Sequence, residues 1–172
     1  TPAVDLIEVG TGGGSIAHLD LGVLTVGPES AGASPGPACY GHGGDAPTVT
    51  DANLVLGYLD PDYFLGGDLH LDLDSALRVV KRKVADRLAL SLEDGAYAIH
   101  AVANASMANA MRAVTIQRGF DPRDFGVVAF GGAGPAHAVS IAAELGSREI
   151  VIPANAGVIS AMGLLFAPIK FE

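Results

Sequence analysis

Short apolar stretches separated by glycines open the chain. Residues 6–9, 15–20 and 23–26 lean apolar, and glycine-rich turns at 10–14 and at Gly22 divide them. Short segments of this kind, joined by tight turns, pair in antiparallel order. The pattern therefore predicts three consecutive antiparallel strands at the start of the chain.

The apolar residues change to a helical spacing in the middle of the chain. A Gly- and Pro-rich stretch at 27–50 comes first, and it is longer than an ordinary connecting loop. Residues that cap helix N-termini then predict three helices, which begin at Asp51, Asp74 and Ser91. We expect 51–118 to be a mainly helical segment, with the third helix its longest element.

The last part of the chain alternates between strand and helix. Apolar strand patterns at 126–130 and 149–152 are each followed by a helical pattern. This alternation predicts a βαβα unit over 126–172. Together with the early strands it gives an α/β fold with a mixed five-stranded sheet flanked by helices. A length of 172 residues fits a single domain.

Charge is distributed unevenly along the chain. The net charge is −9, and all ten Lys and Arg residues lie at Arg78 or later. Binding to nucleic acid or to an anionic membrane would require clustered cations, which the first part of the chain lacks. No apolar run reaches the roughly 18 to 20 residues that span a bilayer. We therefore expect neither nucleic acid nor a membrane as a partner.

Cysteine and glycine usage adds two expectations. Cys39 is the one cysteine, and no signal-peptide pattern is present, which predicts a reducing, cytoplasmic setting. The 23 glycines are about twice the usual share, so backbone can lie close to backbone or to a ligand. Because the chain opens at Thr1 rather than at Met, we expect it to be a piece of a larger subunit.

The first glycine turn is a candidate anion site. It contains Gly12, Gly13, Gly14 and Ser15, and backbone N–H groups in such a turn can converge on an anion. A plain hairpin turn is the alternative. No Gly-Lys-Ser/Thr follows, so the turn is not a Walker loop. A strand follows in place of a helix, which excludes a dinucleotide-binding oxidoreductase.

A second glycine turn lies between a predicted strand and a predicted helix. Gly131, Gly132, Ala133 and Gly134 occupy the carboxyl end of that strand, where ligands of α/β sheets bind. A tight strand-to-helix connection is the alternative. With no cation near the first turn, a bound phosphate would need Mg²⁺ and backbone dipoles to offset its charge.

Four further residues are candidates for chemistry. Asp51 and His137 are the catalytic candidates, and His137 follows the second glycine turn directly. Cys39, His42 and Asp51 are the candidate metal ligands, although zinc sites normally show paired Cys or His residues. For each of them a structural role is the alternative.

Long strings in the chain resemble the hydantoinase A/5-oxoprolinase family, which includes N-methylhydantoinase A-like proteins and subunits of acetone and acetophenone carboxylases. The resemblance spans nearly the whole chain. It rests on IEVGTGGGSIAHLD, VGPESAGASPGPACYGHGG, PTVTDANLVLGYLDPDYFLGG, RGFDPRDFGVVAFGGAGPAHA and IVIPANAGVISAMGLL.

The resemblance implies one half of an actin-like, RNase H-like ATPase that binds ATP with Mg²⁺ or another divalent metal. Residues 10–15 would form its second phosphate loop and 131–134 its adenosine loop. The first phosphate loop would lie upstream. Actin-like proteins usually carry an Asp just before the glycines of the second loop, whereas this chain has Gly10 and Thr11 there.

The resemblance also implies an activity. The family suggests an ATP-dependent cyclic amidase that opens a lactam or imide ring, of the hydantoin or 5-oxoproline type, together with a hydantoinase B-like partner subunit or domain. The alternatives are an ATP-dependent ketone carboxylase subunit and a non-catalytic, nucleotide-responsive assembly module.

Overall fold

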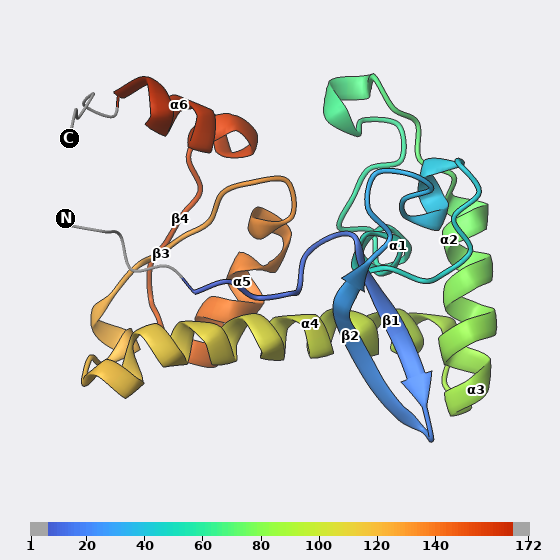
Figure 1. Cartoon of the computed structure of the whole chain (residues 1–172), viewed down its shortest axis with the longest axis horizontal. Helices are drawn as coiled ribbons and strands as arrows, with labels where there is room; N and C mark the ends of the chain where they lie inside the picture. Colours follow the sequence, from blue (N-terminus) through green and yellow to red (C-terminus); the bar gives the residue numbers. More distant parts are fainter. Residues whose placement is uncertain (1–6, 167–172) are drawn as a thin grey trace, which may run out of the picture.

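The longest element is the 23-residue helix α4 (Leu92–Val114), around which the other elements are arranged (Figure 1). The structure is a computed structural model, and it describes residues 7–166. Ser91 caps α4 as the sequence predicts, because its hydroxyl accepts a hydrogen bond from the Asp94 N–H at 3.0 Å. Small residues on α4 such as Gly95 and Ala103 are buried, so neighbouring backbones approach it closely.

The remaining elements lie toward the two ends of α4 (Figure 1). Near its N-terminal half are β1 (Ser15–Asp20), β2 (Val23–Ser30), α1 (Val49–Val55), α2 (Leu73–Val80) and α3 (Asp86–Leu88). Near its C-terminal half are β3 (Val127–Val128), α5 (Gly134–Leu145), β4 (Ile150–Val151) and α6 (Ile159–Phe166).

The predicted five-stranded sheet is wrong for the described part of the chain. There, β1 and β2 form one antiparallel pair, while β3 and β4 form a separate parallel pair. Residues 7–9 form no strand, and Leu6 lies outside the described residues. A strand needs a hydrogen-bonded neighbour, and the two pairs lie near different ends of α4 (Figure 1). The predicted strand–helix–strand unit is present as β3, α5 and β4.

Two helices begin a few residues earlier than the sequence predicts. Helix α1 is capped by Thr48 in place of Asp51, which takes the third helical position of a capping box. Helix α2 is capped by Asp72 in place of Asp74. Both errors have one cause, because an acid in the first turn of a helix satisfies the same free N–H groups as a cap does. Helix α2 then continues through a π-helical segment, Lys81–Ala85, into α3.

The main core lies where α4 meets α1, α2 and the β1–β2 hairpin. Its fully buried side chains are small or β-branched, among them Val49, Val80, Val84 and Ile99. By contrast, Val128 of β3 and Phe130, two residues after it, are about half exposed, at 56% and 49%. Within residues 7–166, no helix has the length and hydropathy needed to cross a membrane.

Candidate functional site

The first glycine turn is held by its own serine and by helix α1. The Gly12 N–H donates to the Ser15 hydroxyl at 2.9 Å. The Gly13 carbonyl accepts two hydrogen bonds from Thr50, one from the N–H at 2.8 Å and one from the hydroxyl at 2.9 Å. A β-carbon on Gly13 would lie 2.9 Å from the Thr50 hydroxyl oxygen. Any side chain at this position would therefore displace Thr50.

The second glycine turn lies beside the first. Gly131 has a φ of +84° and donates its N–H to the Ala156 carbonyl at 2.8 Å, which fixes the start of the turn. A β-carbon built on Gly13 would lie 3.6 Å from the β-carbon of Ala133. The structure thus brings together two turns that are far apart in the sequence.

A cavity of about 370 Å³ lies between the two turns. Backbone forms part of its wall, and aromatic and aliphatic side chains form another part. The residues that line it are Gly13, Gly14, Tyr40, Thr50, Asn53, Leu59, Phe64, Leu65, Gly132, Ala133 and Ala136. None of these side chains carries a charge, so a charged ligand would meet only dipoles there.

Backbone donors are available on this wall. The N–H groups of Gly13, Gly14, Gly132 and Ala133 have no hydrogen-bond partner among residues 7–166. Free N–H groups of adjacent residues in glycine-rich turns are typical binding groups for phosphate oxygens. The four residues that carry these N–H groups line one cavity.

Four buried polar side chains lie behind the cavity and connect three helices. The His100 Nδ1–H donates to Asn53 Oδ1 at 2.8 Å, and Asn53 Nδ2 donates to His137 Nε2 at 3.2 Å. The His137 Nδ1–H donates to Asn104 Oδ1 at 2.7 Å. The two imidazole rings stack with their centroids 4.7 Å apart. Asn53, on α1, therefore belongs to both the network and the cavity wall.

The catalytic candidate His137 is fully buried and does not line the cavity. Both of its ring nitrogens are engaged, by Asn53 and Asn104. Burial, together with the neighbouring His100, lowers the pKa of His137 to about 4. The ring is therefore neutral at pH 7 and holds α5 against α1 and α4.

The other catalytic candidate, Asp51, is also fully buried. Its Oδ1 accepts from the Cys39 N–H at 2.8 Å, and its Oδ2 accepts from the Thr48 N–H at 2.9 Å and the Thr48 hydroxyl at 2.8 Å. The Ala38 N–H adds a fourth bond at 3.3 Å. These donors occupy the carboxylate, which ties the Ala38–Tyr40 turn to the start of α1.

The three candidate metal ligands do not form a ligand set. Burial and the negative charge of Asp51 raise the pKa of the Cys39 thiol well above its usual range, so the thiol is protonated. His42 is exposed. Residues 7–166 contain no group of three or more His, Cys, Asp or Glu side chains that could hold a metal ion.

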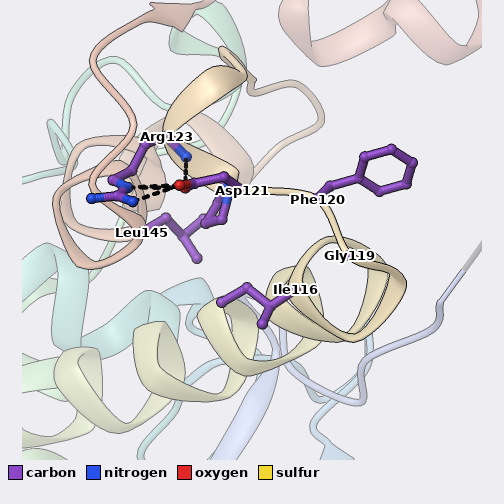
Figure 2. A pocket seen from close by; sticks show the side chains of 7 residues that line it. Ile116, Gly119, Phe120, Asp121, Arg123 and Leu145 are labelled. Carbon is purple, nitrogen blue, oxygen red and sulfur yellow. Dashed lines mark hydrogen bonds and ion pairs between the residues drawn. The ribbon is translucent and has the colours of Figure 1, made fainter.

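A second, larger cavity of about 540 Å³ lies elsewhere, lined by Ile116 and residues 119–123 after α4 and by Leu145 at the end of α5 (Figure 2). Arg123 and Asp121 face each other there with their closest atoms 2.6 Å apart, and this contact lowers the pKa of Asp121 to about 2. The two charges offset each other. None of the candidate residues from the sequence lines this cavity.

Sequence reasoning missed Thr50, which bonds to the first glycine turn, and Asn53 and Asn104, which bond to His137. Thr50 and Asn53 lie three residues apart on α1, and His100 and Asn104 lie four apart on α4. Both spacings place a pair on one helix face. This signal, polar residues on a face that is otherwise apolar, was present in the sequence.

The whole chain, residues 1–172, matches the hydantoinase/oxoprolinase family. The chain belongs to this family. Caprolactamase subunit alpha of Pseudomonas jessenii is 46% identical over 172 residues, covering 99% of this chain and 25% of that protein. The 5-oxoprolinase 1 of Arabidopsis thaliana is 38% identical over 184 residues, covering 98% of this chain and 14% of that protein. This member of the family thus spans a quarter or less of the length of these relatives.

Solved structures of family relatives share the fold. The crystal structure of ATP-dependent caprolactamase from Pseudomonas jessenii superposes with a TM-score of 0.84 at 48% identity, covering 93% of this chain and 23% of that chain. The nucleotide-free structure of acetone carboxylase gives a TM-score of 0.82 at 35% identity, covering 89% of this chain and 22% of that chain. The predicted α/β fold is confirmed at this level.

Proposed function

We propose that the cavity between the two glycine turns binds ATP, as one half of an actin-like nucleotide site. The observation that carries this proposal is that four residues on its wall, Gly13, Gly14, Gly132 and Ala133, have backbone N–H groups with no partner among residues 7–166. Ser15 contributes by fixing the first turn rather than by lining the cavity. Gly12 and Gly134 flank the donors on either side.

The uncharged wall constrains how phosphates would be bound. Backbone dipoles offset only part of a triphosphate's charge, so a divalent cation such as Mg²⁺ would have to supply the rest. Among residues 7–166, no carboxylate lines the cavity. The cation would therefore be held mainly by the phosphates and by water.

The activity we propose for the whole protein is ATP-dependent hydrolysis of a cyclic amide, a lactam or an imide. Family membership and the likeness to an ATP-dependent caprolactamase and a 5-oxoprolinase support it. Transfer of the γ-phosphoryl group of ATP to the amide oxygen would release ADP and make the ring carbon open to attack by water. Cleavage of the ring C–N bond would then leave an acyl phosphate, which a second water hydrolyses to the open-chain acid and inorganic phosphate. In such transfers the protein mainly positions the reactants and offsets charge.

An ATP-dependent ketone carboxylase subunit is the second candidate. The TM-score of 0.82 to acetone carboxylase supports it.

We also propose a hydantoinase B-like partner, since the relative of Pseudomonas jessenii is named as a subunit. A non-catalytic assembly module is the third candidate, because the connection between β2 and α1, residues 31–48, is longer than an ordinary loop.

The test is ADP release by the complete gene product, co-expressed with its partner subunit and supplied with Mg-ATP. The candidate substrates are caprolactam, 5-oxoproline, hydantoin, and acetone with bicarbonate. We expect one cyclic amide to raise ADP release and to undergo ring opening. Stimulation by acetone with bicarbonate alone would favour the carboxylase. No stimulation in a folded, assembled protein would favour the assembly module.

The matched variants are Gly13→Val and Gly163→Ala. Gly13→Val would displace Thr50, because a β-carbon there lies 2.9 Å from its hydroxyl oxygen, and we expect ADP release to be lost. Gly163, on α6, has open space where its β-carbon would lie, so Gly163→Ala is the control. Normal ADP release by a folded Gly13→Val protein would contradict the proposed site.

A further inference from the structure

Helix α1 contacts the segments that carry both glycine turns. At its start, Thr50 donates two hydrogen bonds to the Gly13 carbonyl of the first turn. Three residues later, Asn53 donates to His137, which lies in the first turn of α5, directly after the second glycine turn. Thr50 and Asn53 also line the cavity between the turns. One short helix thus spans the distance between the two proposed halves of a ligand site.

The contact between Asn53 and His137 has a single orientation. Oδ1 of Asn53 is occupied by the His100 N–H, so its amide nitrogen faces His137. His137 accepts at Nε2 and donates from Nδ1 to Asn104. Hydrogen bonds that run in one direction through neutral, buried groups leave little freedom for rotation. His100 is 2% exposed and His137 is fully buried, so water does not compete for these contacts.

We propose that Thr50 and Asn53 are positioning residues, which set the separation of the two glycine turns so that their free N–H groups reach one nucleotide. The proposal rests on the function proposed above. Its physical basis is that backbone donors cannot adjust by changing rotamer, as a Lys or Arg side chain can. The affinity of such a site depends on how rigidly the two backbone segments are held, and displacements on the order of 1 Å are costly.

The experiment measures two quantities on the complete gene product. The first is the Kd for ADP, by isothermal titration calorimetry. The second is hydrogen–deuterium exchange in the ligand-free protein, in peptides that cover 10–16 and 131–140. The variants are Asn53→Leu, which cannot bond to His137, and Thr50→Val, which removes the hydroxyl bond to Gly13 and keeps the shape of the side chain.

Each variant is expected to loosen one turn. Asn53→Leu should raise the Kd for ADP about tenfold, the effect of one lost buried hydrogen bond, and speed exchange at 131–140 but not at 10–16. Thr50→Val should also raise the Kd for ADP, and it should speed exchange at 10–16 but not at 131–140. His137→Leu removes the bond to Asn53 and also the bond to Asn104, so the effects of Asn53→Leu and His137→Leu on the Kd should be less than additive in the double variant.

Two controls separate positioning from general loss of stability. Asn109→Leu makes the same substitution on the exposed face of α4, where Asn109 bonds only to Arg112 among the described residues. Val84→Ala truncates a fully buried side chain that does not line the cavity. Both should leave the Kd for ADP unchanged, and Val84→Ala should do so despite a lower melting temperature.

The outcomes distinguish this inference from the proposed function. A folded Asn53→Leu protein with a Kd within twofold of the wild type would overturn the inference, and so would additive effects in the double variant. If the wild type itself does not bind ADP, the proposed function fails. Hydrogen–deuterium exchange then decides whether α1 positions the turns. Faster exchange confined to one turn in each variant supports the inference, and faster exchange in both turns refutes it.

Discussion

Lowering the pH is expected to weaken folding because two histidines are buried in their neutral form. His137 is fully buried and has a pKa of about 4, and burial also lowers the pKa of His100. In the unfolded chain a histidine has a pKa of about 6.5. Between these values the unfolded state binds a proton that the folded state does not, so the free energy of unfolding falls as the pH falls.

The size of the effect follows from the shift. For His137 the difference between the ordinary histidine pKa of 6.5 and a pKa of about 4 in the folded protein corresponds to about 3 kcal/mol, lost at about 1.4 kcal/mol per pH unit. This contribution is fully present above pH 6.5. His100 adds to it with the same sign. The ion-paired carboxyl of Asp121 has a pKa of about 2, so its protonation affects stability only at lower pH.

The assay is urea unfolding followed by circular dichroism at intervals from pH 7 to pH 4.5. The variant His137→Gln should show a shallower dependence on pH, whereas exposed His42→Gln should match the wild type. Direct titration of the histidine Cε1–H signals by NMR gives a second measurement that needs no variant. A His137 signal that titrates near pH 6.5, or a free energy of unfolding that is flat between pH 6.5 and 4.5, would refute the reasoning.

Three further predictions concern the contacts that hold the first half of the fold. Asp51→Ala should lower the free energy of unfolding by about 3 kcal/mol in urea titrations, because it leaves the buried N–H groups of Ala38 and Cys39 without an acceptor. A loss below about 1 kcal/mol would contradict a structural role for Asp51. The Cys39 thiol should react with a disulfide reagent only as fast as the protein unfolds, since it is buried and protonated at pH 8; rapid labelling of the native protein would disprove this. Ser91→Ala should cost about 1 kcal/mol by removing the cap of α4, and Ser91→Asp should restore most of it.

The sequence predicted features that depend on neighbouring residues. The cap at Ser91, the β3–α5–β4 unit and the two glycine turns are all set by residues close together in the chain. The family resemblance, confirmed by the match over residues 1–172, rests on long continuous strings. Helix caps, turn residues and the spacing of apolar residues all lie within short segments, so a sequence alone can indicate them.

The features that were missed depend on long-range contacts. The five-stranded sheet was inferred from strand patterns alone, which do not say whether two strands reach each other. Asp51 accepts hydrogen bonds from the N–H groups of Ala38 and Cys39, twelve or thirteen residues away, and its place in the sequence does not indicate these partners. The contact between Asn53 and His137 joins residues 84 positions apart. No spacing within either segment indicates that they meet.

The buried polar network and the uncharged cavity are consistent with one physical requirement. Residues 1–77 contain no Lys or Arg, so a phosphate ligand there would be bound mainly by backbone N–H groups and a metal ion. Such donors bind well only when the backbone around them is fixed. Among the described residues, no fully buried side-chain nitrogen or oxygen lacks a hydrogen-bond partner. The buried groups Thr50, Asn53 and His137 hold that backbone in place, so the strength of the proposed site would come from packing behind the cavity rather than from charge on its wall.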